Sequence, residues 1–512
     1  MLVKAFGAAV QGINATIVTI EVNVSQGIRF LHVGLPDNAV RESHERIASA
    51  LEYTGYSMPR KQIVINMAPA DIRKEGSAYD LSLAIGILAG AGTIKSEELE
   101  KYVIMGELSL DGGLQPIKGI LPIAIKAREE GFKGFILPKQ NAREAAVVNN
   151  LEVYGVENIK EVIEFFNEVS TLEPTIVNTR DEFFSNLNLS EIDFSDVKGQ
   201  ESVKRALEVS AAGGHNIIMV GPPGAGKSML AKRLPTILPP LSLQEALETT
   251  KIHSVAGNID SNTSLISQRP FRSPHHTISD VALVGGGAFP QPGEISLAHN
   301  GVLFLDELPE FKRTVLEVMR QPLEDRKICI SRAKFSIEFP ASFMLVASMN
   351  PCPCGYYNHP DRDCVCGPGV VQKYLSRISG PLLDRIDIHI EIVPVPFEKL
   401  AEMKDSESSE KVRERVMKAR QIQEQRFKDI DGVYCNAQMS SKQQRTFAQT
   451  DKSSSELLKN AMQRLNLSAR AYDRIIKVAR TIADLDESEN ILSNHIAEAI
   501  NYRNLDREGW AG

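Results

Sequence analysis

A glycine-rich segment between an apolar run and a helix-forming run carries the strongest chemical signal in the sequence. Glycines let backbone N–H groups approach phosphate oxygens, a lysine brings a positive charge to them, and a serine hydroxyl can ligate Mg²⁺. The apolar run 216–220 before the segment and the run 229–234 after it predict a strand and a helix. We therefore predict a phosphate-binding loop of the pattern G-x-x-x-x-G-K-[ST]. Its residues are Gly221, Pro222, Pro223, Gly224, Ala225, Gly226, Lys227 and Ser228.

Two acidic residues follow a second apolar run. Val302 to Leu305 predicts a buried strand, and Asp306 and Glu307 come directly after it. At a strand tip beside the phosphate loop, Asp306 is placed to hold Mg²⁺ through water and Glu307 to polarise an attacking water. Taken alone, two acids after an apolar run also fit an exposed sheet edge. Their pairing with the phosphate loop favours the catalytic interpretation.

A third apolar run, Phe343 to Ala347, leads to Asn350. An amide at the tip of this strand could orient the attacking water against a γ-phosphate. The alternative is a turn-forming asparagine before Pro351.

Four of the six cysteines crowd into one short segment: Cys352, Cys354, Cys364 and Cys366. A disulfide framework is not expected in a large chain of a reducing compartment. Four thiolates can close a tetrahedral zinc site directly after the third strand, and His359 could replace one of them. Reduced free thiols are the alternative, because C-x-C is a less specific spacing than C-x-x-C. No acid constellation accompanies the cysteines, so a catalytic zinc is not expected.

A proline-stiffened loop, residues 269–277, combines basic and aromatic side chains. Arg269 and Arg272 flank Phe271. Such a loop could contact phosphates and stack on a base. The alternative is a loop at a subunit interface.

A hairpin is predicted further along the chain. Residues 327–330 and 334–339 read as two short strands around Ser331 to Ala333. Arg332 and Lys334 would lie near the tip of this hairpin.

The composition of the whole chain limits its function classes. With 512 residues it should hold about three domains. Hydrophobic residues make up 43% and charged residues 24%, as in folded globular proteins. The net charge of −7 argues against a protein that coats nucleic acid, but leaves room for a basic path on one face or in one channel. The apolar stretch 81–94 suits a buried helix better than a membrane span of about 20 residues, and the first residues lack a secretory pattern. We expect a cytoplasmic protein without a membrane segment.

Changes in periodicity divide the chain into regions. Residues 1–167 mix alternating strands with helices, which predicts an α+β domain. Residues 168–192 are polar and read as a linker. Residues 193–396 alternate short apolar runs with helical stretches, the α/β pattern of a parallel sheet covered by helices. Residues 397–512 have a helical period throughout.

The phosphate loop, the acidic strand and Asn350 together resemble the AAA+ P-loop NTPases, in which Asn350 would be sensor 1. Residues 193–200 look like the lead-in that these modules place near the adenine. The resemblance implies an AAA+ core with a helical lid, and ATP and Mg²⁺ as cofactors.

Three arginines gain roles from this resemblance. Arg385 stands where the MCM helicases carry the arginine finger that is offered to a neighbour's γ-phosphate, and Arg377 is a second candidate. Arg470 resembles sensor 2 in the lid. On the residues alone, a surface ion pair is the favoured role for Arg385 and Arg377. A finger acting on a neighbour implies a homo-oligomer, as a hexameric ring.

Residues 292–307 are similar to the corresponding segment of MCM helicases and magnesium chelatase, whose hairpins point to the ring's pore. Because the MCM hairpin contacts DNA, the resemblance implies that Arg332 and Lys334 contact single-stranded or branched DNA.

Residues 106–112 and the segments after them resemble the proteolytic domain of Lon and its relative in RadA. The resemblance implies a Lon-like fold that lacks the proteolytic activity of Lon. Ala78 stands where Lon has its serine, with Ser77 one residue away, and residues 121–123 contain no lysine. Ser77 is therefore interpreted as a turn residue.

A degenerate Lon-like domain, a magnesium-chelatase-like AAA+ core and a helical lid identify the chain as a member of the ComM/YifB family. The resemblance implies an ATP-driven hexameric DNA motor, of helicase type, that promotes branch migration in homologous recombination and natural transformation. The alternatives are a magnesium-chelatase-like remodelling ATPase and an ATP-dependent protease.

Overall fold

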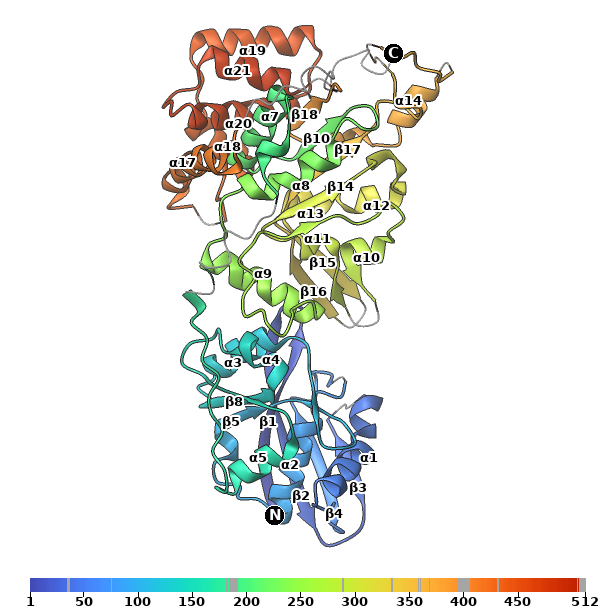
Figure 1. The fold of residues 1–512 in the computed structure, drawn as a ribbon, viewed down its shortest axis with the longest axis vertical. Coiled ribbons are helices and arrows are strands. Elements are labelled where there is room, and N and C mark those ends of the chain that lie inside the picture. The colour runs from blue at the N-terminus through green and yellow to red at the C-terminus, as the bar shows by residue number, and fades with distance from the viewer. Residues whose placement is uncertain are drawn as a thin grey trace. The chain divides into compact units, whose positions relative to one another are not determined.

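The chain forms two compact units, each with its own hydrophobic core (Figure 1). The first unit comprises residues 1–187, 242–267 and 333–339, and the second comprises residues 188–241, 268–332 and 340–512. The computed structural model describes residues 1–34, 37–74, 76–180, 183, 192–287, 290–332, 335–357, 359, 361–367, 369–394, 406–430, 432–503 and 505.

A seven-stranded mixed sheet in the order β3-β4-β2-β1-β5-β8-β9 is the base of the first unit. β1 pairs antiparallel with β2, and β5, β8 and β9 follow β1 as parallel neighbours. Every second residue of β2 from Val18 to Val24 is buried, which is the cause of the alternating pattern in the sequence. The strands are β1 Leu2–Gln11, β2 Asn14–Ser25, β3 Phe30–Val33, β4 Gln62–Ala68, β5 Tyr102–Ile104, β8 Gly134–Pro138 and β9 Glu152–Val156, with a separate pair formed by β6 Glu107–Leu108 and β7 Leu114–Gln115.

The apolar stretch predicted as a buried helix is α2, Asp80–Ala91. Gly86 and Gly90 let α2 lie directly on β2, because a Cβ at either glycine would come within 2.9 Å of the side chain of Val22 or Val24. Within the described part of the chain, no helix combines the length and apolar character needed to cross a membrane. The other helices of this unit are α1 Asn38–Tyr53, η1 Leu99–Lys101, α3 Ile120–Glu129, α4 Lys139–Ala145, α5 Ile159–Phe166 and α9 Leu243–Ala256.

Ser77 lies just before α2, and its hydroxyl donates to the carboxylate of Glu107 in β6. This contact ties the turn before α2 to a neighbouring strand, which agrees with a structural use of the hydroxyl. Leu121 and Ile123, where the Lon comparison would require a lysine, are buried in α3.

Five parallel strands in the order β11-β14-β17-β10-β18 form the sheet of the second unit. β10, β14 and β17 are buried along their whole length, as expected for a parallel sheet covered on both faces. Parallel strands bring their carboxyl ends to one edge, so the residues that follow these strands gather there. The strands are β10 Ile217–Val220, β11 Phe271–Arg272, β14 Val302–Leu305, β17 Met344–Met349 and β18 Ile388–Glu391.

The C-terminal helices, orange to red in Figure 1, form the predicted helical region, and α17 and α20 pack on α7. They are α17 Ser409–Phe427, η5 Asn436–Gln438, α18 Ser441–Phe447, α19 Lys452–Arg464, α20 Ala469–Leu485 and α21 Ser493–Asn501. The remaining helices of the second unit are η3 Phe194–Asp196, α7 Glu201–Gly213, α8 Lys227–Ile237, α10 Asp280–Val284, α11 Glu294–Leu297, η4 Leu308–Glu310, α12 Arg313–Val318, α13 Arg320–Asp325, α14 Val370–Leu375 and α15 Gly380–Leu383.

Two short two-stranded sheets complete the elements: β12 Gly285–Gly286 with β13 Gln291–Pro292, and β15 Lys327–Arg332 with β16 Phe335–Pro340. The second pair is the predicted hairpin, with one correction. Ser331 and Arg332 belong to β15, whereas the sequence predicted them in the turn, because the strand extends two residues beyond the apolar run that ends at Ile330. Lys334 lies outside the described residues, as do the expected boundary at 396–397 and residues 181, 182 and 184–191 of the expected linker.

Candidate nucleotide site

The phosphate-loop motif forms the connection between β10 and α8, and α8 begins at Lys227. Gly224 and Gly226 have φ angles of +79° and +86°, in the left-handed region that favours glycine. Gly221 passes so close to the end of β18 that a Cβ would lie 2.6 Å from the carbonyl oxygen of Ile392. The glycines thus fold the loop around the N-terminus of α8, where free backbone N–H groups and the helix dipole favour an anion.

Lys227 is buried inside this loop. Its amine donates to the carbonyl oxygens of Gly221 (2.6 Å) and Pro222 (2.9 Å) and to Oδ1 of Asn350 (3.0 Å). Burial lowers the pKa of the Lys227 amine, and the nearby carboxylates of Asp306 and Glu307 partly oppose this shift. The structure therefore joins the predicted phosphate lysine and the predicted sensor 1 asparagine.

Asp306 lies between two hydroxyl groups. The Ser228 hydroxyl donates to Oδ2 of Asp306 at 2.8 Å, and the Ser348 hydroxyl donates to Oδ1. Hydroxyl and carboxylate oxygens are hard donors of the kind that Mg²⁺ prefers, so this pair fits the predicted metal site. Ser348 was not predicted to take part, because its contact depends on β17 lying between β10 and β14.

Glu307 begins the turn after β14 with a φ of +54°, and its side chain is about half exposed. Nδ1 of His276 lies 3.7 Å from Oε2 of Glu307, an ion pair when the imidazole is protonated. The ring of His276 also packs edge-on against Phe311. His276 follows β11, the strand next to β14, so the loop 269–277 contacts the predicted catalytic acid. The sequence contains no pattern that indicates the contact between His276 and Glu307.

The two candidate arginine fingers and the candidate sensor 2 arginine differ in exposure. Arg385 is only 9% exposed, and it pairs with Glu324 and donates to the carbonyl oxygen of Pro381. The Arg377 side chain is 53% exposed, with a guanidinium nitrogen 3.1 Å from a carboxylate oxygen of Glu310. The Arg470 side chain is 63% exposed. It lies 3.1 Å from Asp384, which immediately precedes Arg385.

The two arginines of the loop 269–277 both have internal partners. Arg269 donates to the carbonyl oxygens of Pro239, Pro240 and Asn300. Arg272 forms a bidentate pair with Glu294 at 2.6 and 2.7 Å. Both side chains therefore stabilise the loop, and a phosphate would have to displace these partners.

A buried network joins the sheet to α20, and the sequence analysis did not identify it. Asp387 receives one hydrogen bond from Arg474 (2.9 Å) and contacts Nδ1 of His215 (3.3 Å), while Nε2 of His215 contacts the Thr481 hydroxyl (2.8 Å). Burial alone would raise the pKa of Asp387, but Arg474 and His215 hold it below its usual value. Burial, with Arg474 nearby, lowers the pKa of Lys477 to about 8. The network fixes the helix that carries Arg470 next to the segment that carries Arg385.

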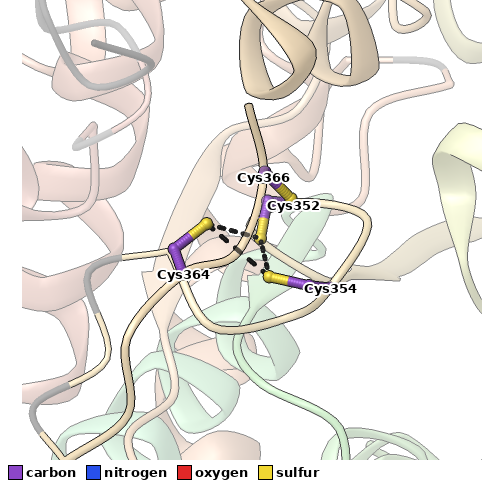
Figure 2. Close-up of side chains that lie close together, drawn as sticks. All are labelled: Cys352, Cys354, Cys364 and Cys366. Carbon is purple, nitrogen blue, oxygen red and sulfur yellow. Dashed lines mark hydrogen bonds between the residues drawn. The ribbon is translucent and has the colours of Figure 1, made fainter. Parts of the chain in front are cut away.

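The four clustered cysteines converge, with their sulfurs directed toward one another (Figure 2). They lie in the segment after β17, and all four sulfur atoms lie within 4.8 Å of each other. Among the described residues, His359 is not a member of this cluster, and its Nδ1 accepts from the backbone of Asp361. None of the six cysteines, all of which lie among the described residues, forms a disulfide.

The fold and the site define an AAA+ ATPase, with a phosphate loop, an acidic strand and an intervening sensor strand on one parallel sheet, and a helical lid. Family models agree: "Magnesium chelatase, subunit ChlI" matches residues 193–400, "Subunit ChlI of Mg-chelatase" residues 20–141, and "Magnesium chelatase, subunit ChlI C-terminal" residues 406–503. The chain belongs to the ComM/YifB family of magnesium-chelatase-like proteins, as its relatives show.

Two of these relatives match essentially the whole chain. The competence protein ComM of Haemophilus influenzae is 44% identical over 510 residues, 99% of this chain and 98% of that protein. The YifB protein of Escherichia coli is 44% identical over 98% of this chain and 96% of that protein. Lon protease 2 of Bacillus subtilis is 30% identical over 189 residues, 31% of this chain and 33% of that protein.

Proposed function

We propose that this protein is an ATP-driven hexameric DNA motor that promotes branch migration in homologous recombination and natural transformation, in the cytoplasm. The observation that carries the proposal is the contact between His276 and Glu307, because it connects a loop with basic and aromatic residues to the acid that activates water. Full-length similarity to a protein named for competence supports DNA as the substrate.

ATP hydrolysis uses the residues gathered at the strand ends. The loop N–H groups and Lys227 would hold the β- and γ-phosphates, and Ser228 and Asp306 would hold Mg²⁺. When bound, Mg²⁺ offsets the charge that develops on the phosphate oxygens. Glu307 polarises the attacking water, and Asn350 orients it. In the structure the side-chain oxygen of Asn350 accepts a hydrogen bond from Lys227. Binding of the γ-phosphate would replace Asn350 by a phosphate oxygen as the acceptor for Lys227.

A neighbouring subunit completes each site in this proposal. Arg385 and Arg377 are the candidates for contact with the neighbour's γ-phosphate, whereas Arg470 is the sensor 2 candidate, which contacts the phosphates from the lid. Nε of Arg385 is buried without a hydrogen-bond partner within the described part of the chain, so its donor capacity is not filled internally. To reach a neighbouring subunit, Arg385 must break its ion pair with Glu324. The negatively charged γ-phosphate would then replace the carboxylate of Glu324 as its partner.

DNA contact is assigned to the hairpin of β15 and β16, through Arg332 and Lys334. Arg269 and Arg272 are secondary candidates, since each already has internal acceptors. A separate structural metal, zinc, is assigned to the four clustered cysteines.

A junction assay tests the motor. The purified protein is incubated with ATP, Mg²⁺ and a labelled three-strand DNA junction, and junction resolution and phosphate release are both measured. We expect the wild-type protein to resolve the junction and to hydrolyse ATP faster in its presence. The Lys227→Ala variant should neither hydrolyse ATP nor resolve the junction. If the wild-type protein hydrolyses ATP but neither responds to nor resolves the junction, the magnesium-chelatase-like remodelling alternative is favoured. Mass photometry of the same sample, with ATP analogue present, measures the subunit number.

A further inference from the structure

The distances between the clustered sulfur atoms match those expected for thiolates around a tetrahedral metal ion. The Sγ atoms of Cys352 and Cys354 lie 3.3 Å apart, those of Cys352 and Cys364 3.7 Å, and those of Cys354 and Cys364 3.6 Å. A tetrahedron with zinc–sulfur bonds of about 2.3 Å has sulfur–sulfur edges of about 3.8 Å. A disulfide would bring two sulfurs to about 2.0 Å. With the sulfur of Cys366 within 4.8 Å of the other three, the arrangement fits four thiolates around a single tetrahedral ion.

The segment that carries these cysteines has little structure of its own. Between Cys352 and Cys366 the described residues form turns and bends without a helix or strand. Cys352 is buried and the other three thiols are half-buried. A loop with this little apolar burial gains its order from crosslinks, and a bound metal supplies four bonds at once.

The cysteine loop contacts the phosphate loop. Gly355, one residue after Cys354, has a φ of +86°, and a Cβ on it would lie 2.5 Å from Cδ of Pro223. The backbone N–H of Gly355 donates to the carbonyl oxygen of Cys352 (3.0 Å), so the turn between the first two cysteines packs on the phosphate loop.

The same turn continues from the sensor residue. Asn350 is separated from Cys352 by Pro351 alone, and its amide accepts from Lys227. The cysteine turn is therefore connected to two parts of the phosphate site: through Pro351 to Asn350, and through the contact of Gly355 with Pro223 to the loop.

We propose that the four cysteines hold one Zn²⁺ as a clasp that sets the positions of Pro223 and Asn350, so that zinc binding and nucleotide binding strengthen each other. This inference rests on the proposed nucleotide site but not on a DNA substrate. Coupling between two sites is reciprocal, so nucleotide must raise the affinity for zinc by the same factor by which zinc raises the affinity for nucleotide, a factor of about 5 to 150 in typical cases.

The first measurement is the metal content of the full-length protein purified without added metal. Elemental analysis should find about one zinc per chain, in keeping with a four-thiolate structural site. Cys364→Ser should lose most of the zinc, whereas Cys329→Ser, which changes a cysteine of β15 outside the cluster, should keep it. A zinc-free wild-type protein, or one containing iron instead, overturns the assignment. Circular dichroism of both variants checks that they are folded.

The second measurement is the coupling itself. Zinc release to a chromogenic chelator is followed with and without a non-hydrolysable ATP analogue and Mg²⁺. We expect the analogue to slow zinc release from wild-type protein by about tenfold, within the usual range of coupling, and to leave release from Lys227→Ala unchanged. Equal release with and without the analogue overturns the coupling even if zinc is present. Neither readout involves DNA, so failure here is distinct from failure of the motor proposal.

Discussion

Nδ1 of His276 and Oε2 of Glu307 lie 3.7 Å apart, although the two residues follow different strands of the sheet. The contact holds the predicted catalytic acid from the side of the loop 269–277. In the proposed motor, a substrate that moves this loop also moves the partner of Glu307.

We predict that His276→Ala raises basal ATP hydrolysis two- to fivefold and weakens its stimulation by DNA. A partly exposed ion pair stabilises by up to about 1 kcal/mol, which corresponds to a rate factor of about five. Steady-state phosphate release checks the prediction. His275→Ala is the matched control, because the neighbouring imidazole contacts Thr277 instead of Glu307. A loss of hydrolysis in His276→Ala would show that the imidazole takes part in the chemistry.

Glu307→Gln should separate ATP binding from hydrolysis. The amide keeps the size of the side chain but cannot accept the proton of water, so we expect hydrolysis to fall by about 10²- to 10⁴-fold. Nucleotide binding, measured with a fluorescent ATP analogue, should be retained because Lys227 and the phosphate loop are unchanged. Similar turnover in wild type and variant would exclude Glu307 as the activating acid.

Mixing two inactive variants tests whether an arginine acts on a neighbour's site. Lys227→Ala lacks a working phosphate loop and Arg385→Ala lacks the candidate finger, so each alone should be inactive. In randomly mixed rings, about a quarter of the interfaces combine an intact loop with an intact arginine. We expect hydrolysis to recover to a corresponding extent on mixing. Repeating the mixture with Arg377→Ala tests the second candidate, and no recovery with either arginine variant contradicts action across the interface.

Removing the carboxylate at the centre of the lid network should destabilise the second unit. Asp387 is 1% exposed and faces both Arg474 and His215. Asp387→Ala leaves a buried charge without its partner, which costs about 3–5 kcal/mol of unfolding free energy. Asp384→Ala, which removes the more exposed partner of Arg470, should cost less than about 1 kcal/mol. Urea unfolding followed by circular dichroism compares the two, and equal losses would contradict this reading of the network.

Local patterns in the sequence determined much of the nucleotide site. The phosphate loop could be predicted because its glycines are required by the backbone itself, as the positive φ angles of Gly224 and Gly226 show. Asp306 and Asn350 could be predicted because each follows an apolar run, and parallel strands end at one edge. The close spacing of the four cysteines in the sequence likewise predicted a cluster, and in the structure their sulfur atoms lie within 4.8 Å of each other.

The remaining contacts depended on strand order and helix packing, which no local pattern contains. Ser348 reaches Asp306 because β17 lies between β10 and β14, and His276 reaches Glu307 because β11 is the neighbour of β14. Asp387 meets His215 and Arg474 only when α20 packs beside the sheet. Backbone conformation and burial determine which residue types occur at neighbouring positions in the chain, so local sequence patterns reveal them. Contacts between distant segments depend instead on how the folded sheet and helices pack together.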